Sequence, residues 1–166
     1  ETIVTFDDDK YFPSNLLENL FRTSLEHPRD VIGSRGWIIR EGESGIHYGS
    51  SWDRATPGMR GQNLLTPGGN GCLYPPTSMD SAVNDLAMAL EICPTADDIW
   101  FWGALQKAGS TLTCLGYPAH RPVAALKSTM ALSTTNQIDN DTQFQRALDY
   151  WGIRDSFSAH ARGTSS

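Results

Sequence analysis

Three consecutive carboxylates, Asp7, Asp8 and Asp9, directly follow the β-branched and aromatic run 2–6. Such a run predicts a buried strand, whose end would carry the acidic side chains into the crevice where open α/β sheets bind ligands. Bare neighbouring carboxylates repel one another, whereas a divalent cation turns that repulsion into attraction. Mg²⁺ and Mn²⁺ prefer carboxylate oxygens and keep positions open for water and substrate phosphates. The triplet therefore indicates a metal site, with a solvated acidic turn as the plainer alternative.

A second acidic pair, Asp97 and Asp98, follows Thr95 at the predicted start of a helix. The helix dipole favours acids there, which is a sufficient structural explanation. Alternatively, one carboxylate is a general base that removes a proton from a substrate hydroxyl, or it positions that hydroxyl. Adjacent helical residues diverge by about 100°, so only one of the two faces the crevice. We favour Asp98, which shares a face with Trp102 and Leu105, although Asp97 also shares a face with Leu105.

A glycine-rich turn precedes a short predicted strand. Gly69, Asn70 and Gly71 would let the backbone approach a donor sugar or phosphate closely. The segment lacks the Lys-Ser/Thr ending of a phosphate loop, so a tight turn is an equal alternative. Arg60 lies in the long aperiodic loop 41–69 and would pair with a diphosphate, although a solvated arginine explains it as well.

Two tryptophans flank the second acidic pair. Trp100 and Trp102 could stack on a pyranose face, although helical tryptophans usually belong to the core. Residues two apart on a helix diverge, so we expect only one of them to share the core face and the other to form a site wall. His120 is a further candidate metal ligand, with an ordinary loop histidine as the alternative.

The elements that must position these side chains alternate between strands and helices. Strands are expected at 2–6, within 31–40, at 71–74 and at 111–115, and helices near 14–27, 80–91, 97–108 and 141–151. This order predicts an α/β fold, a mixed sheet flanked by helices, with Asp7–Asp9 at the carboxyl end of a strand.

The apolar periodicity also predicts which helix faces meet the core. In the first helix, Leu17, Phe21 and Leu25 recur at helical spacing, with Leu16 and Leu20 beside them. The faces expected in the later helices are Val83, Leu86, Ala87 and Leu90 in 80–91, and Phe144, Leu148 and Trp151 in 141–151. The residues expected to cap helices are Ser14 or Asn15, Asp80 and Thr95.

Composition limits the class of protein. With 166 residues, 39% hydrophobic, the chain fits one folded domain, expected at 1–157, followed by a frayed tail at 158–166. A net charge of -6 disfavours nucleic-acid binding, which needs a basic surface. Three cysteines without a CxxC pair favour a reducing, cytoplasmic location. No apolar run reaches the roughly 20 residues of a membrane span, which leaves peripheral membrane association open.

Four segments, in the expected order along the chain, resemble one bacterial and viral branch of the GT-A glycosyltransferases. This branch is similar to glycosyltransferase family 2. They are Thr-Phe-Asp-Asp-Asp-Lys-Tyr-Phe-Pro at 5–13, Gly-Asn-Gly-Cys-Leu-Tyr-Pro-Pro at 69–76, Cys-Pro-Thr-Ala-Asp-Asp-Ile-Trp at 93–100, and Asn-Asp-Thr-Gln at 140–143. The first resembles the DxD segment of these enzymes. The resemblance implies transfer of a sugar from a nucleotide diphosphate sugar, UDP-linked by expectation, to a glycan or glycolipid acceptor.

The resemblance also implies roles for individual residues. Asp9 would ligate Mn²⁺ or Mg²⁺, and Asp7 would contact the cation or the donor. Asp8, between them, would lie on the donor side of the site. Asp98 or Asp97 would face the acceptor hydroxyl. Gly69, Asn70, Gly71 and Arg60 would contact the donor, and Trp100 or Trp102 the acceptor.

GT-A domains usually place a nucleotide-binding half before the DxD segment, whereas this sequence opens on the DxD strand. We therefore expect the catalytic C-terminal half, with the nucleotide half supplied by a larger chain or a partner. Two other classes stay open. A haloacid-dehalogenase-like phosphatase also follows a strand with Asp-x-Asp, although Lys10-Tyr11 departs from that pattern. A non-catalytic sugar-binding or assembly module is the second alternative.

Overall fold

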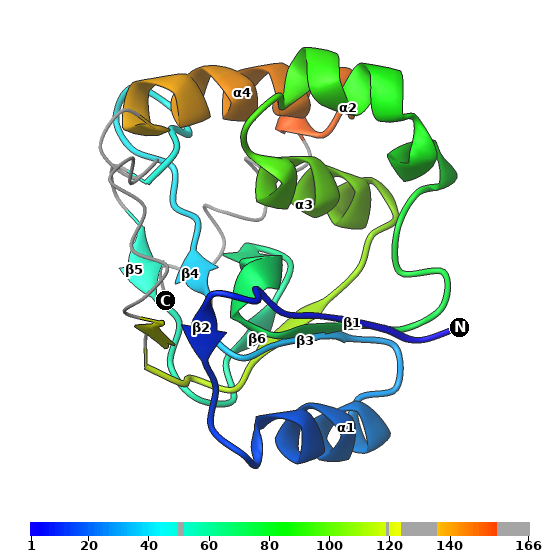
Figure 1. Ribbon diagram of the computed structural model, residues 1–166. Helices are drawn as coiled ribbons and strands as arrows, with labels where there is room; N and C mark the ends of the chain where they lie inside the picture. The colour runs from blue at the N-terminus through cyan, green and yellow to red at the C-terminus, as the bar shows by residue number, and fades with distance from the viewer. Residues whose placement is uncertain (50–51, 119, 124–135, 156–166) are drawn as a thin grey trace.

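A computed structural model describes residues 1–49, 52–118, 120–123 and 136–155 (Figure 1). The tail expected at 158–166 lies outside these residues. In chain order the elements are β1 (Ile3–Thr5), β2 (Lys10–Tyr11), α1 (Leu16–Glu26), β3 (Val31–Gly33), β4 (Trp37–Ile38), β5 (Asp53–Arg54), β6 (Arg60–Gly61), β7 (Leu64–Leu65), η1 (Gly68–Asn70), β8 (Cys72–Tyr74), η2 (Ser81–Asn84), α2 (Leu86–Ile92), α3 (Asp97–Lys107), β9 (Leu112–Cys114), β10 (Arg121–Pro122) and α4 (Asn136–Tyr150).

The main sheet has five strands in the order β1-β8-β3-β9-β6. Strands β3 and β9 run parallel, while the other neighbours pair antiparallel, so the sheet is mixed. Figure 1 shows α1 on one face of this sheet and α3, with α2 and α4 beyond it, on the other. Two smaller sheets have the strand orders β5-β4-β7 and β10-β2. The predicted α/β fold with a mixed sheet and flanking helices is confirmed.

Helix α3 lies at the centre of the larger core. Its buried residues are Ile99, Trp100, Trp102, Gly103, Ala104 and Leu105. Phe144, Leu148 and Trp151 of the last helical segment are also buried, which confirms the face predicted for them. A Cβ on Gly103 would come within 2.2 Å of the Trp151 ring, so glycine is what lets α3 and that segment approach closely. The packed helices hold the start of α3 in place.

Strand β1 is not the buried strand that its composition predicts. It lies at the edge of the five-stranded sheet, and Ile3 and Phe6 are 60% and 40% exposed. β-branched and aromatic residues suit central and edge strands alike, so composition could not distinguish the two positions.

The apolar face predicted for α1 is confirmed only at Leu16 and Leu20. Leu16 and Leu20 are buried against Ile32 and Leu73, whereas the expected stripe is exposed at Leu17, Phe21 and Leu25. The two stripes are offset by one residue, and both have the four-residue spacing of a helix. Only the position of the sheet decides which stripe is buried.

The segment predicted as one helix over 80–91 is divided. Asp80 caps η2 as predicted by accepting from the N–H of Ala82, but Asp85 then caps a separate helix, α2. Leu86, Ala87 and Leu90, predicted to face the core, are exposed. A second Asp cap interrupts the helix and turns the apolar positions outward.

The predicted starts of three helices also need correction. Asn15 is at the cap position of α1 without a side-chain capping bond, and α4 begins at Asn136, five residues before Asp141. Thr95 does not cap α3, which begins after Ala96. The hydroxyl of Thr95 instead accepts a hydrogen bond from the side chain of Gln143, so a tertiary contact takes the place of the local cap.

Candidate functional site

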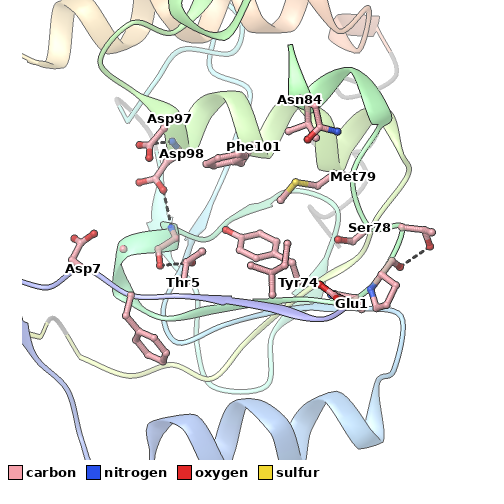
Figure 2. A pocket seen from close by; sticks show the side chains of 18 residues that line it. Glu1, Thr5, Asp7, Tyr74, Ser78, Met79, Asn84, Asp97, Asp98 and Phe101 are labelled. Atoms are coloured by element: carbon pink, nitrogen blue, oxygen red, sulfur yellow. Dashed lines mark hydrogen bonds between the residues drawn. The ribbon is translucent and has the colours of Figure 1, made fainter. Parts of the chain in front are cut away.

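A cavity of about 560 Å³ lies between β1, η1, the segment after β8 and the start of α3 (Figure 2). Asp7, Asp97 and Asp98 line it, although they are far apart in the sequence. The antiparallel pairing of β1 with β8 carries the acidic turn to one side of the cavity, and α3 begins on the opposite side. The fold therefore brings both acidic segments to one site.

Asp98 is half-buried at the first turn of α3 and points into this cavity. Its Oδ1 accepts a hydrogen bond of 2.7 Å from the backbone N–H of Gly68. Burial raises the pKa of Asp98 to about 6, and the nearby carboxylates of Asp97 and Asp7 act in the same direction. A carboxylate with this pKa is ionised near neutrality and is basic enough to accept a proton.

Asp97 has a different position on the same turn. Its Oδ1 accepts from the backbone N–H of Asp98 at 2.9 Å, and the residue is exposed at the rim of the cavity. This contact satisfies one of the free amides at the helix start. The pair thus separates into Asp98, inside the cavity, and Asp97, bonded to the helix end.

Asp7 lies across the cavity from Asp98, against η1. A Cβ on Gly69 would come within 2.1 Å of its Oδ1, so the carboxylate approaches that backbone more closely than any side chain would allow. Its Oδ2 pairs with the ammonium of Lys10 at 2.6 Å, and its backbone N–H donates to the carbonyl of Gly69. The donor contact expected for Gly69 stays a prediction.

The hydroxyls of Thr5 and Tyr74 lie close to Gly68, where the carboxylate of Asp98 also approaches. Thr5 donates to the carbonyl of Gly68 at 2.9 Å, and the hydroxyl of Tyr74 interacts with Thr5. Burial raises the pKa of Tyr74, so its hydroxyl stays protonated and can donate. The sequence alone did not mark either side chain as part of the site, although Thr5 precedes Asp7 by two residues.

Asp8 and Asp9 occupy the turn between β1 and β2 and are exposed. The backbone carbonyl of Asp9 accepts from the N–H of Val123. Across the described residues, no group of three or more His, Cys, Asp or Glu side chains is arranged to hold a metal. Mg²⁺ needs only one or two protein carboxylates when a diphosphate supplies the remaining oxygens, and the half-exposed Asp7 suits that role. A cation there would compete with Lys10.

The other residues of the glycine-rich turn have structural contacts. Gly71 adopts φ +97°, and a Cβ there would approach the Phe6 ring at 2.9 Å. The carbonyl of Asn70 accepts from Ser34 and lies 2.9 Å from Nε2 of His120, while its side chain lies 3.4 Å from Lys10. Burial lowers the pKa of His120. This turn therefore joins the acidic site to the loop around His120.

Arg60 does not line this cavity, so its expected contact with the donor stays a prediction without support from the geometry of the site. Its guanidinium forms a two-bond pair with the buried carboxylate of Asp30, which also accepts from Thr113 at 2.7 Å. Burial opposes ionisation of Asp30, but these hydrogen bonds outweigh it and lower the pKa of this carboxyl. Because β6 pairs with β9, Arg60 is held against the sheet rather than in a free loop.

Both tryptophans belong to the core, so the expectation that only one would do so is wrong. Trp100 and Trp102 are each 2% exposed, and their indole N–H groups donate to the carbonyls of Val83 and Leu64. Packing surrounds α3 on more than one side, so its core face is wider than a single stripe. The aromatic side chain of α3 that lines the cavity is Phe101, which lies between them in the sequence.

The segment 140–143 supports the site from a distance. The side chain of Gln143 is buried, accepts from the N–H of Thr95 at 3.1 Å and donates to its hydroxyl at 2.9 Å. Asp141 accepts from the N–H of Tyr48 and lies 3.1 Å from Nδ1 of His47. Two loops are thus fixed to α4, and one of them leads into the turn that carries Asp98.

Comparisons with protein-family models, curated proteins and solved structures gave no match to this chain. Within the part of the chain that the structure describes, no helix combines the length and apolarity that crossing a bilayer requires.

Proposed function

We propose that this chain is the catalytic part of a metal-dependent glycosyltransferase of the GT-A type, using a UDP-linked sugar and a glycan or glycolipid acceptor in the cytoplasm. The observation that carries the proposal is the pairing of Asp7 and Asp98 across one cavity. Asp7 is half-exposed beside a glycine-rich backbone, which suits contact with a donor and its cation. Asp98 is half-buried and basic, which suits contact with a hydroxyl.

The proposed reaction uses each side chain for a separate task. Asp98 accepts the proton of the acceptor hydroxyl while the hydroxyl oxygen attacks the anomeric carbon of the donor. The bond from that carbon to the diphosphate breaks, and the diphosphate leaves with the electron pair. A bound Mn²⁺ or Mg²⁺ supplies charge stabilisation for that leaving group, with Asp7 and Asp9 as its proposed protein ligands. Lys10, paired with Asp7, adds positive charge on the same side.

Release of UDP from a panel of UDP-sugars, measured with Mn²⁺ and glycan acceptors, tests the proposal. Asp98→Asn keeps an acceptor for the N–H of Gly68 but removes basicity, so we expect turnover to fall by about 10²–10⁴-fold while donor binding persists. Asp97→Asn is the matched control, because it changes the neighbouring acid that bonds the helix end. Wild-type activity should rise as the pH passes through about 6, where Asp98 ionises.

Near wild-type transfer by Asp98→Asn would contradict the base role. Turnover of p-nitrophenyl phosphate without UDP release would instead favour the phosphatase alternative. Binding of a glycan without either reaction would favour the non-catalytic module.

A further inference from the structure

The cavity has two chemically different ends (Figure 2). Asp7 and Asp98 lie at one end, beside the backbone of η1. At the other end Tyr74, Met79 and Phe101 form an apolar and aromatic wall, and the polar residues Glu1, Ser78 and Asn84 also line that end. An apolar group can therefore lie against this wall while polar groups of the same molecule meet Asp7 and Asp98.

The apolar end is aligned with the acidic end by the geometry of α3. Phe101 follows Asp98 by three residues, so the two side chains share one face of the helix. Tyr74 extends from β8 on the opposite wall and is 6% exposed, and Met79 lies on the side away from Asp7. Two aromatic rings and a thioether thus form a slot that continues from the carboxylate of Asp98.

The charge of the lining restricts what can enter. Among the described residues that line the cavity there is no lysine or arginine, whereas Glu1, Asp7, Asp97 and Asp98 contribute carboxylates. Lys10 is nearby, but its ammonium already contacts Asp7 at 2.6 Å. Unless a divalent cation accompanies it, as proposed for the donor, a phosphorylated or otherwise anionic molecule would place negative charge against these carboxylates without a lysine or arginine in the lining to offset it.

We infer that the cavity takes a neutral glycoside as acceptor, with a sugar hydroxyl at Asp98 and an apolar aglycone between Tyr74 and Phe101, against Met79. This inference rests on the proposed function, because it names the acceptor for the same cavity. Burial of the aglycone supplies the affinity, and the hydrogen bond to Asp98 sets the orientation of the sugar.

Binding to the complete 166-residue chain tests this inference without any donor. The ligands are the p-nitrophenyl β-glycosides of glucose, galactose and N-acetylglucosamine, the three free sugars, and glucose 6-phosphate. Calorimetry should show at least one nitrophenyl glycoside binding about tenfold more tightly than its free sugar, and glucose 6-phosphate more weakly than glucose. Saturation-transfer NMR should show the nitrophenyl protons in contact with the protein.

Phe101→Ala should abolish the tenfold gain, and the milder Phe101→Leu should retain part of it. Leu25→Ala on α1 is the matched control, since Leu25 is an exposed apolar residue outside the cavity, and it should change nothing. Equal affinity for glycosides and free sugars, a gain that survives Phe101→Ala, or preference for glucose 6-phosphate would each overturn the inference. Tighter binding of the glycoside without any sugar transfer would support this inference and contradict the proposed function. Sugar transfer without tighter binding of the nitrophenyl glycoside would support the proposed function and contradict this inference.

Discussion

Asp98 links the proposed chemistry to the stability of the fold. Its pKa is raised from 3.8 to about 6 by burial, so the folded protein binds this proton more tightly than the unfolded chain does. The associated stabilisation is fully present below pH 4 and is lost as the pH rises through about 6. At higher pH the native state therefore holds an ionised carboxylate at a cost.

Asp98→Asn removes that cost and keeps the hydrogen bond from Gly68. We expect the variant to be more stable than the wild type by about 1–3 kcal/mol near pH 8, and equal to it near pH 4. Urea unfolding at both pH values measures the difference. A variant less stable than the wild type at pH 8 would contradict a raised pKa.

Arg60 serves a different purpose from the one its loop position suggested. Its guanidinium compensates the buried Asp30. Arg60→Met should therefore lower the melting temperature, because a buried carboxylate loses its partner, while donor affinity stays unchanged. Scanning calorimetry and UDP titration measure the two effects, with Arg22→Met on the exposed side of α1 as the control. Loss of UDP binding with an unchanged melting temperature would restore the donor-binding role.

At the scale of elements, the contact between α4 and the start of α3 positions the site. The buried amide of Gln143 makes two hydrogen bonds to Thr95, two residues before the acidic pair begins. Gln143→Met keeps the volume of the side chain and leaves both groups of Thr95 without these partners. We expect a loss of about 1–3 kcal/mol in the free energy of unfolding.

The same substitution should also lower turnover, with a smaller effect on donor affinity, because it displaces the turn that carries Asp98. Gln106→Met is the matched control, since the side chain of Gln106 on α3 donates to the carbonyl of Gln62 but does not line the cavity. If both variants lose stability equally and neither loses turnover, Gln143 is a structural residue alone.

At the scale of the whole molecule, two buried thiols report whether the sheet unfolds as a unit. Cys72 and Cys114 lie opposite Gly33 on the two strands that flank it. Two strand spacings separate their Cα atoms by roughly 9–10 Å, beyond the reach of about 7 Å that a disulfide allows. Both thiols are free, and burial raises the pKa of Cys72 to about 11.

We therefore expect a thiol reagent to label Cys72 and Cys114 only on global unfolding, at one common rate at each urea concentration. Peptide mass spectrometry measures the labelling of each residue, and a reductant should leave the melting temperature unchanged. Separate rates for the two cysteines, or fast labelling in native buffer, would show that the sheet opens in parts.

The acidic pair Asp97 and Asp98 shows which features the local sequence was sufficient to predict. Asp97 and Asp98 diverge on a helix by covalent geometry, so the two carboxylates had to point in different directions whatever the tertiary fold. The segments around Asp7 and Gly69 were recognisable as candidates because runs of acids and glycines are rare outside sites and turns. The order of strands and helices likewise follows from periodicity, which is a local property.

Other features depended on packing that the sequence does not encode locally. Leu17 and Leu16 begin equally apolar stripes on α1, and the sheet selected the second. Trp100 and Trp102 are both buried because α3 is enclosed on several sides. Burial also set the pKa of Asp98, which no sequence pattern predicts.

By itself the sequence determined the α/β class, the acids able to do chemistry and their separation on the helix, because each follows from neighbours along the chain. Only the tertiary structure decided that Asp7 and Asp98 share a cavity, that Tyr74, Met79 and Phe101 complete it, and that Arg60 lies elsewhere. These contacts join residues tens of positions apart, so they depend on how the sheet pairs and on which helix faces it buries.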